Sequence, residues 1–259
     1  MDEWLGLLRS VFIYWRPGRQ RGLRRLYRQF VGPGDLVFDI GAHLGDRSVA
    51  CAALGAHVVA LEPQPRVAAW LRRLTGQHAG ITVLSEAVGR TIGTAQLAIS
   101  RRTPTVSTLA QQWRQRIPDA NPSFRHVRWE QFVDVPVTTL DALIETYGLP
   151  GFCKIDVEGY EAEVLAGLSH PVPHVSIEYV SGSLEVAAAC VRRLEVLGSY
   201  EFNAVPGEQR QFVFDDWLRC GRMLEWLAGG ADGVSSGDVY ARLRARSPRL
   251  IPPSSGLTY

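Results

Sequence analysis

The sequence is poor in lysine and close to charge balance. Lys154 is the only lysine among its 259 residues, and 28 basic residues stand against 26 acidic ones, for a net charge of +2. A chain so nearly neutral lacks the basic excess of a typical nucleic-acid-binding domain and the acidic excess of a solvating tail. The preference for arginine over lysine indicates a GC-rich coding bias rather than a function.

The cysteines are too widely spaced to suggest a metal centre or a disulfide framework. They form no C-x-x-C pair and no cluster with histidine, so we expect no bound metal ion. We interpret them as small buried side chains in a reducing compartment. They are Cys51, Cys153, Cys190 and Cys220.

Long apolar runs are also missing. The apolar stretch at residues 11–15 is too short for a signal peptide or a membrane span, so we expect a cytoplasmic protein. Apolar residues do recur at helical spacing over residues 4–15, and several arginines follow. This pattern suits either an interfacial helix on anionic lipid or a cap packed on the main domain. We favour the cap, because the aromatic stripe equally suits burial, and peripheral membrane contact is the alternative.

What is present is the composition of an ordinary globular protein, with 46% hydrophobic and 21% charged residues. Strand-like and helix-like segments alternate along the chain, which predicts an α/β fold built on a mainly parallel sheet. The expected strands are residues 36–40, 57–61, 81–84, 94–100, 152–157, 175–179, 200–205 and 211–214. The expected helices are residues 46–54, 66–74, 161–168 and 184–197, and one that begins after Thr138 or Thr139.

Three parts are expected along the chain. Residues 1–33 form an N-terminal helical cap, residues 34–215 the main domain, and residues 216–259 a C-terminal helical tail. Residues 101–134 break the alternation with prolines and aromatic residues, and we expect them to form an insertion that covers the substrate. Four of its side chains could stack on a sugar ring or merely pack the insertion: Trp113, Phe124, His126 and Trp129.

The most informative motif is LVFDIGAHLG at residues 36–45. An apolar strand with Asp39 near its end runs into a turn that holds Gly41 and Gly45, and glycines there let the backbone approach a nucleotide-like cofactor. His43 replaces the second glycine of the dinucleotide fingerprint, where its side chain would crowd a pyrophosphate. This departure favours S-adenosylmethionine, which has no phosphates. The Asp39 carboxylate suits its cationic methionine end.

Glu62 ends the second expected strand, about 20 residues after the glycine turn. A carboxylate at this place can accept hydrogen bonds from both hydroxyls of a cofactor ribose. A solvated charge at a strand end is the alternative, but the order of strand, turn, helix, strand and acid favours the ribose role. NAD carries the same diol, so Glu62 does not distinguish the two cofactors.

A second motif, KIDVEGYE, spans residues 154–161. Asp156 and Glu158 follow a central strand at its carboxyl end, the edge where ligands bind in open α/β sheets. Two acids beside a cofactor can orient a hydroxyl, accept its proton or hold an ammonium group. The alternative is an ion pair with Lys154 and a favourable helix-dipole contact. We assign Glu161 to that structural role, and Asp156 and Glu158 to the site.

Together the motifs resemble the FkbM-type S-adenosylmethionine-dependent methyltransferases. The resemblance covers about residues 34–180 and rests on VFDIGAHLG, LEP at 61–63, EAVG at 86–89, VTTLDAL at 137–143, KIDVEGYE and the pair Ile177-Glu178. It implies a class I methyltransferase fold, a Rossmann-like seven-stranded sheet with helices on both faces and an antiparallel last strand. It also implies S-adenosylmethionine as cofactor and methyl transfer to a hydroxyl oxygen, commonly on sugars or secondary metabolites.

The resemblance also assigns site residues by position. Asp39, Gly41 and Gly45 would line the methionine end of the cofactor, with His43 as a polar neighbour. Glu62 would hold the ribose, Glu86 and Ala87 would border the adenine, and Asp156 would lie beside the methyl group. It does not assign the catalytic base. We favour Asp156 or Glu158, with Glu178 as a further candidate.

Two other functions stay open. One is an NAD-dependent oxidoreductase, and the other is an inactive methyltransferase-like domain that binds a partner, although its intact acids argue against the second. A nucleic-acid methyltransferase is disfavoured by the charge balance and by the lack of an Asn/Asp-Pro-Pro-aromatic motif. We therefore expect a small-molecule or glycan acceptor, and the sequence does not predict the oligomeric state.

Overall fold

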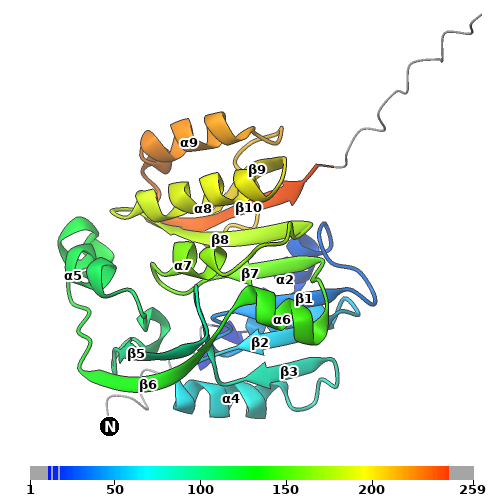
Figure 1. Ribbon diagram of the computed structural model, residues 1–259, viewed down its shortest axis with the longest axis vertical. Helices are drawn as coiled ribbons and strands as arrows, with labels where there is room; N and C mark the ends of the chain where they lie inside the picture. The colour runs from blue at the N-terminus through cyan, green and yellow to red at the C-terminus, as the bar shows by residue number, and fades with distance from the viewer. Residues whose placement is uncertain (1–10, 13, 17, 245–259) are drawn as a thin grey trace, which may run out of the picture.

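The computed structural model describes residues 11–12, 14–16 and 18–244 (Figure 1). Their main feature is a seven-stranded sheet in the order β3-β2-β1-β7-β8-β10-β9. In this order, each strand from β3 to β8 is parallel to the next one, and β10 is antiparallel to both β8 and β9. This confirms the predicted Rossmann-like sheet with one antiparallel strand. The strands are β1 (Leu36–Ile40), β2 (His57–Leu61), β3 (Ile81–Leu84), β7 (Phe152–Ile155), β8 (His174–Val180), β9 (Tyr200–Pro206) and β10 (Ser236–Leu243).

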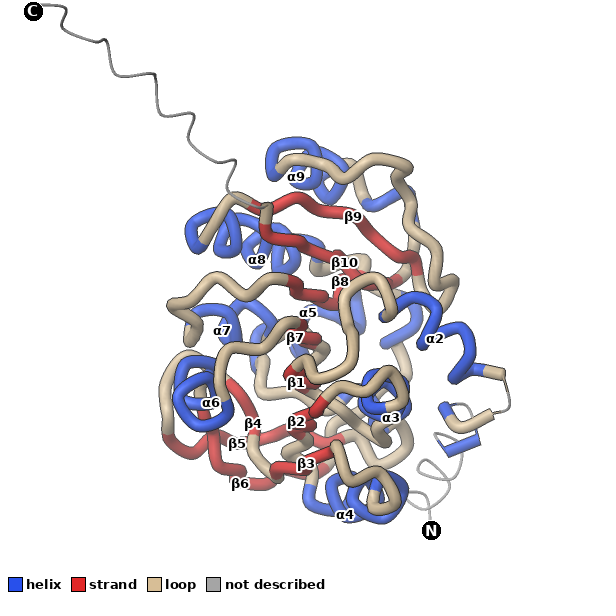
Figure 2. The backbone as a smooth tube through the Cα atoms, turned by 90° about the vertical axis from the view of Figure 1, so that its right-hand side faces the viewer, coloured by secondary structure: helices blue, strands red, loops and turns tan. Residues whose placement is uncertain are grey.

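Helices cover both faces of this sheet (Figure 2). On one face lie α6 (Leu140–Tyr147), α7 (Glu161–Ala166) and α8 (Leu184–Leu197), and on the other α2 (Arg19–Tyr27) and α3 (Asp46–Ala52). Successive side chains of a strand point to opposite faces, so β1 sends Phe38 into the core beneath α7 and α8 and Val37 into the core beneath α2. Burial on both faces explains why the inner strands are almost continuously apolar. Of the remaining helices, α4 (Pro65–Thr75) packs against β3 and α9 (Cys220–Ala228) against α8.

The insertion contains more regular structure than predicted. β6 (Gln131–Thr138) pairs with β5 (Gly93–Ile99) and with the short β4 (Ala87–Val88) in a separate three-stranded sheet. Between β5 and β6 lie η1 (Pro104–Val106), α5 (Gln111–Ala120) and η2 (Pro122–Phe124). β5 was predicted and β6 was missed, because Pro136 lies inside it and proline usually argues against a strand with neighbours on both sides.

The predicted last strand is wrong. Residues 211–214 are not a strand, and the sheet is completed instead by β10, from the region expected to be a helical tail with a Gly/Ser-rich break. Gly237 suggested a loop, but it is a glycine because β10 lies very close to its neighbours. A Cβ there would collide with the carbonyl of Val205 and come within 2.7 Å of the Tyr179 hydroxyl. Between residue 216 and the start of β10, α9 is the only α-helix.

The described part of the N-terminal segment packs on the main domain. Leu23, Leu26 and Tyr27 of α2 are at most 4% exposed, and Trp15 Nε1 donates a hydrogen bond to the Leu44 carbonyl at 3.2 Å. Residues 1–10 of the expected N-terminal cap, and residues 245–259 of the expected C-terminal tail, lie outside the described residues. Among the described helices, none combines the length and apolar character that crossing a bilayer requires.

Candidate functional site

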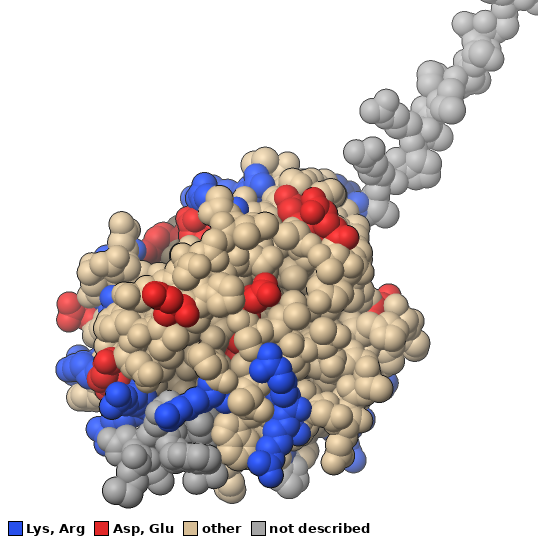
Figure 3. Space-filling view, turned by 60° about the horizontal axis from the view of Figure 1, so that its bottom comes forward, with Lys and Arg blue, Asp and Glu red and all other residues tan. Residues whose placement is uncertain are grey.

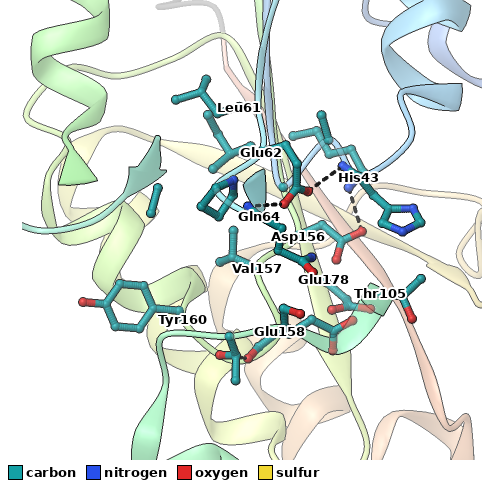
Figure 4. Close-up of a pocket in the computed structure, with 18 of the residues that line it drawn as sticks. His43, Leu61, Glu62, Gln64, Thr105, Asp156, Val157, Glu158, Tyr160 and Glu178 are labelled. Atoms are coloured by element: carbon teal, nitrogen blue, oxygen red, sulfur yellow. Dashed lines mark hydrogen bonds and ion pairs between the residues drawn. The ribbon is translucent and has the colours of Figure 1, made fainter. Parts of the chain in front are cut away.

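A cavity of about 220 Å³ opens where β1, β2, β7 and β8 end, at the edge of the sheet where the two motifs were expected to meet. Strand ends form its floor, the start of α3 one wall, and residues 105–109 of the insertion another (Figure 4). The lining residues that could act chemically are Tyr14, His43, Asp46, Arg47, Glu62, Glu86, Thr105, Thr108, Lys154, Asp156, Glu158, Glu178, Glu208 and Ser236.

The two glycines of the first motif have different roles. Gly41 has a φ of 80° and lines the cavity, and a Cβ there would collide with the carbonyl of Asp156 on the neighbouring strand. Gly45, with a φ of 78°, lies behind the lining, where a Cβ would collide with Leu71 of α4. Gly45 therefore permits helix packing, whereas Gly41 lets the ends of β1 and β7 converge.

Asp39 also lies behind the cavity wall. It is 2% exposed, and its Oδ2 accepts a hydrogen bond from Ser48 Oγ at 2.5 Å. Burial raises the pKa of Asp39 above its ordinary value. Its direct contact with the methionine end of a cofactor stays a prediction, and the hydrogen bond to Ser48 joins the end of β1 to α3.

His43 lines the cavity as a neutral ring. Burial lowers its pKa to about 4, so the imidazole is uncharged near neutral pH. The ring packs edge-on against Tyr14, with centroids 5.3 Å apart, and the backbone holds a left-handed φ of 48°. This turn aims the His43 backbone N–H at Glu62 Oε2, 3.0 Å away.

Glu62 is oriented by the backbone on both of its oxygens. Oε1 accepts from the Gln64 N–H at 2.8 Å, and Oε2 accepts from the His43 N–H at 3.0 Å. The residue is only 3% exposed, and this burial raises its pKa to about 7. Each carboxylate oxygen keeps lone-pair capacity for a further donor. A ribose diol held by two hydroxyls fits this carboxylate.

Glu86 and Ala87 lie where β3 leads into β4, and both line the cavity. In the sheet order β3-β2-β1-β7, Glu62 follows β2 and Asp156 follows β7. Glu86 and Ala87 follow β3, so they lie on the opposite side of Glu62 from Asp156. The predicted adenine, ribose and methyl positions therefore follow the order β3, β2, β1 and β7 along one sheet edge.

Three carboxyl groups meet at the other end of the cavity. One oxygen from each of Asp156, Glu158 and Glu178 lies within 4.8 Å of the others, and Figure 4 shows the three side chains together. Glu158 Oε2 and Glu178 Oε2 are buried and have no hydrogen-bond partner in the described part of the chain. The sequence named all three residues, but only the fold brings Glu178 from β8 to the other two.

The three acids differ in their electrostatics. Although burial opposes ionisation, the Lys154 ammonium, 2.7 Å from Asp156 Oδ2, holds the pKa of Asp156 below its ordinary value. Burial and then the charge of Asp156 raise the pKa of both Glu158 and Glu178 well above the ordinary value. One carboxylate is therefore fixed in the ionised form, and two neighbours hold their protons tightly.

Glu161 has the structural role predicted for it. Its Oε1 accepts from the backbone N–H groups of Val157 at 3.0 Å and Gly159 at 3.1 Å, which ties the loop after β7 to the start of α7. The same loop holds Glu158 at a left-handed φ of 56°. Glu161 thus shapes the backbone that presents Glu158.

The aromatic residues of the insertion do not face the cavity. Trp113 is 3% exposed, packs edge-on against Phe124 and Trp129, and donates from Nε1 to Ser183 Oγ at 2.9 Å. His126 is exposed. Of the two interpretations, packing within the insertion is therefore the one that the structure supports for Trp113. The insertion meets the site through residues 105–109, and the Thr108 hydroxyl donates to the Glu158 carbonyl at 2.7 Å.

Sequence reasoning missed several lining residues, and four of them come from outside the insertion and can act chemically: Tyr14, Arg47, Glu208 and Ser236. Arg47 could have been found, because it lies in the first turn of the helix that follows the glycine motif. The other three come from the N-terminal segment, the loop after β9 and the start of β10. No motif surrounds them, and only the tertiary structure places them at the cavity.

The sheet order, the close turn at Gly41 and the buried Glu62 carboxylate are those of a Rossmann-like fold with a site for a ribose-containing cofactor. The model of the methyltransferase FkbM domain matches residues 39–223, and the chain belongs to that family. The predicted family and cofactor are confirmed, and the NAD-dependent alternative is set aside. No curated protein matches the chain.

Several solved structures are similar to this chain at low sequence identity. Precorrin-6y C5,15-methyltransferase from Geobacter metallireducens is 11% identical, with a TM-score of 0.43 over 86% of this chain and 87% of that one. A SAM-dependent methyltransferase from Aquifex aeolicus is also 11% identical, with a TM-score of 0.42 over 88% and 94%. Aeropyrum pernix fibrillarin, solved with natively bound S-adenosyl-L-methionine, is 13% identical, with a TM-score of 0.39 over 82% and 68%.

Proposed function

We propose that this methyltransferase methylates a hydroxyl oxygen of a neutral small molecule or glycan, such as a sugar or a secondary metabolite. The observation that carries the proposal is the group of three carboxyls at the end of the cavity, of which two have a strongly raised pKa. An alcohol is a weak nucleophile at neutral pH, and a basic carboxylate that accepts its proton as the C–O bond forms is suited to this reaction.

The three acids have separate roles in this proposal. Asp156, held ionised by Lys154, orients the acceptor hydroxyl, whereas Glu158 has the higher proton affinity and is the base. S-adenosylmethionine would supply the electrophilic methyl group, and its sulfonium charge would favour release of the Glu158 proton to solvent, so that Glu158 is ionised when the acceptor hydroxyl reacts. Glu178 keeps its own proton, because burial and the charge of Asp156 hold its pKa well above the ordinary value. The cavity aligns the acceptor oxygen and excludes water, which are the main protein contributions to a direct displacement.

The charge of the lining supports a neutral acceptor. Carboxyl groups outnumber the cations Arg47 and Lys154, so an acceptor with a phosphate or carboxylate near its reacting hydroxyl would be repelled. The lining carboxyls are Asp46, Glu62, Glu86, Asp156, Glu158, Glu178 and Glu208.

The proposal places the reaction on a small molecule or glycan in the cytoplasm, without nucleic acid and without a membrane partner. The net charge of +2 offers little attraction to a phosphate backbone. The face drawn in Figure 3 carries both basic and acidic side chains, with several of the basic ones along its lower part.

The test measures methyl transfer to a panel of neutral, cationic and phosphorylated alcohols, with the product mapped by NMR. We expect an O-methyl ether and a preference for neutral acceptors. Glu158→Gln should lower kcat by roughly 10²- to 10⁴-fold, as loss of a general base does. Asp156→Asn should also slow turnover more than it weakens cofactor binding.

The control is Glu185→Gln, because Glu185 is an exposed side chain of α8 far from the cavity lining. Wild-type kcat in the Glu158 variant would exclude Glu158 as the base. A C-methyl or N-methyl product would refute the O-methylation proposal. If S-adenosylhomocysteine fails to bind in calorimetry, the inactive methyltransferase-like domain becomes the better description.

A further inference from the structure

Arg47 is one of two cations that face the cavity among the described residues, and the reaction proposed above does not use it. The other cation, Lys154, is 2% exposed and is occupied by Asp156 at 2.7 Å. Arg47 comes from the first turn of α3, directly behind the glycine turn, and its side chain is 16% exposed. It is therefore the cation in this lining that is available to a bound anion.

The guanidinium of Arg47 keeps most of its donor capacity. Among the described residues it makes one hydrogen bond, from Nη2 to Glu208 Oε1 at 3.4 Å, and it lies 3.5 Å from Asp46 Oδ1. Arg19 holds both of these carboxylates more closely, at 2.6 Å for Asp46 and 2.9 Å for Glu208. An arginine offers five N–H donors in a planar fork that matches a carboxylate. The neighbouring acids hold the Arg47 side chain in place without using up that fork.

The order of the predicted adenine, ribose and methyl positions along the sheet edge indicates which part of the cofactor would lie near Arg47. Glu86 follows β3 and Glu62 follows β2, which puts adenine and ribose at that side of the cavity. A cofactor held there extends next over the end of β1, where α3 begins. Its methionine part carries a carboxylate, and the acids of the lining would repel that group. We propose that Arg47 binds the carboxylate of the methionine part of S-adenosylmethionine.

This inference depends on the confirmed cofactor and not on the proposed acceptor. Because a bidentate arginine–carboxylate pair adds geometric specificity as well as charge, Arg47 would fix the direction in which the methionine chain lies. Arg47 is then a positioning residue for the methyl group, which must point toward Asp156 and Glu158.

The experiment is a thermodynamic cycle measured by calorimetry. Wild-type protein and Arg47→Met are each titrated with S-adenosylhomocysteine and with its decarboxylated analogue, which keeps the amino group and lacks the carboxylate. We expect Arg47→Met to weaken S-adenosylhomocysteine binding roughly 10- to 100-fold, the range for a hydrogen bond between charged groups. Affinity for the decarboxylated analogue should change less than about twofold.

Arg47→Lys provides a second variant if the Met variant folds poorly. It should recover part of the lost S-adenosylhomocysteine affinity, because lysine keeps the charge but not the planar fork. Arg90→Gln, at an exposed arginine paired with Glu163, is the control and should bind both ligands as the wild type does. An equal loss for both ligands, or no loss for either, would overturn the inference. Failure of the wild type to bind either ligand would instead contradict the cofactor itself.

Discussion

Glu62 shows how one residue couples burial to ligand binding. Its carboxylate is nearly sealed from solvent and is held by two backbone N–H groups, yet burial still raises its pKa to about 7. The backbone donors lower the cost of ionisation, and burial more than offsets them. The ionised form is the one that would accept hydrogen bonds from both hydroxyls of a ribose, the role predicted for this residue.

We therefore expect cofactor affinity to depend on pH through Glu62. As pH falls below about 7, binding of S-adenosylhomocysteine should weaken by up to about tenfold per pH unit, because the carboxylate must first release its proton. Calorimetry between pH 5.5 and 8.5 measures this slope. Glu62→Gln should bind more weakly at pH 8 and lose most of the pH dependence. An affinity that is constant over this range would argue against contact between Glu62 and the ribose.

At the scale of elements, β10 shows why the C-terminal part belongs to the main sheet. It lies between β8 and β9, and its Tyr240 is 1% exposed. The Tyr240 ring stacks on Phe30 at 5.2 Å and on Phe152 at 6.5 Å, which joins the N-terminal segment, β7 and β10 in one core. Removing this ring should therefore affect the whole domain rather than a tail.

We expect Tyr240→Ala to lower the free energy of unfolding by about 3–5 kcal/mol, the usual cost of deleting a buried aromatic side chain. Denaturant titration followed by circular dichroism measures the change, and Tyr240→Phe should lose much less. Val196→Ala is a suitable control, because this residue of α8 is 77% exposed and should change stability by no more than about 0.5 kcal/mol. Equal stability of Tyr240→Ala and the wild type would contradict the packing of β10.

At the scale of the whole molecule, the buried acids make the free energy of unfolding depend on pH. Burial raises the pKa of Glu62 and Glu161 to about 7, and that of Glu158 and Glu178 further still. In the unfolded chain these groups ionise near their ordinary value of 4.5. The folded protein thus holds protons that the unfolded chain has released, and this contribution to stability is lost as pH rises through 7. His43 acts in the opposite direction, but only between its folded pKa of about 4 and its ordinary 6.5.

The melting temperature of the ligand-free protein should therefore fall as pH rises from about 6.5 to 8.5, because the loss from the buried acids exceeds the opposite contribution of His43. Thermal unfolding in buffers of equal ionic strength measures this slope. Glu161→Gln, which keeps an oxygen for the Val157 and Gly159 N–H groups, should reduce the slope. A melting temperature that is flat or rises over this range would contradict the raised pKa values.

Most of the elements that carry the site, and both motifs, could be predicted from the sequence. Strands 57–61 and 81–84 and the helix at 184–197 were predicted with the bounds observed, because strong apolar patterns lie between clear turn residues. Thr139, proposed as an N-cap, accepts from the Ala142 N–H at 3.1 Å. Glu62, Asp156 and Glu158 were found because each lies at or just after the end of a strand, and strand ends meet at one edge of a parallel sheet.

Only the tertiary structure decided which of these residues face the cavity and what joins them there. Asp39 and Gly45 belong to the same motif as Gly41, yet they lie behind the wall, because the turn sends successive residues to different sides. β10, Tyr14 and Glu208 come from distant parts of the chain and carry no local pattern that marks them. A local sequence records which conformation a segment favours, whereas burial, close contact and shifted pKa values arise only when separate segments pack together.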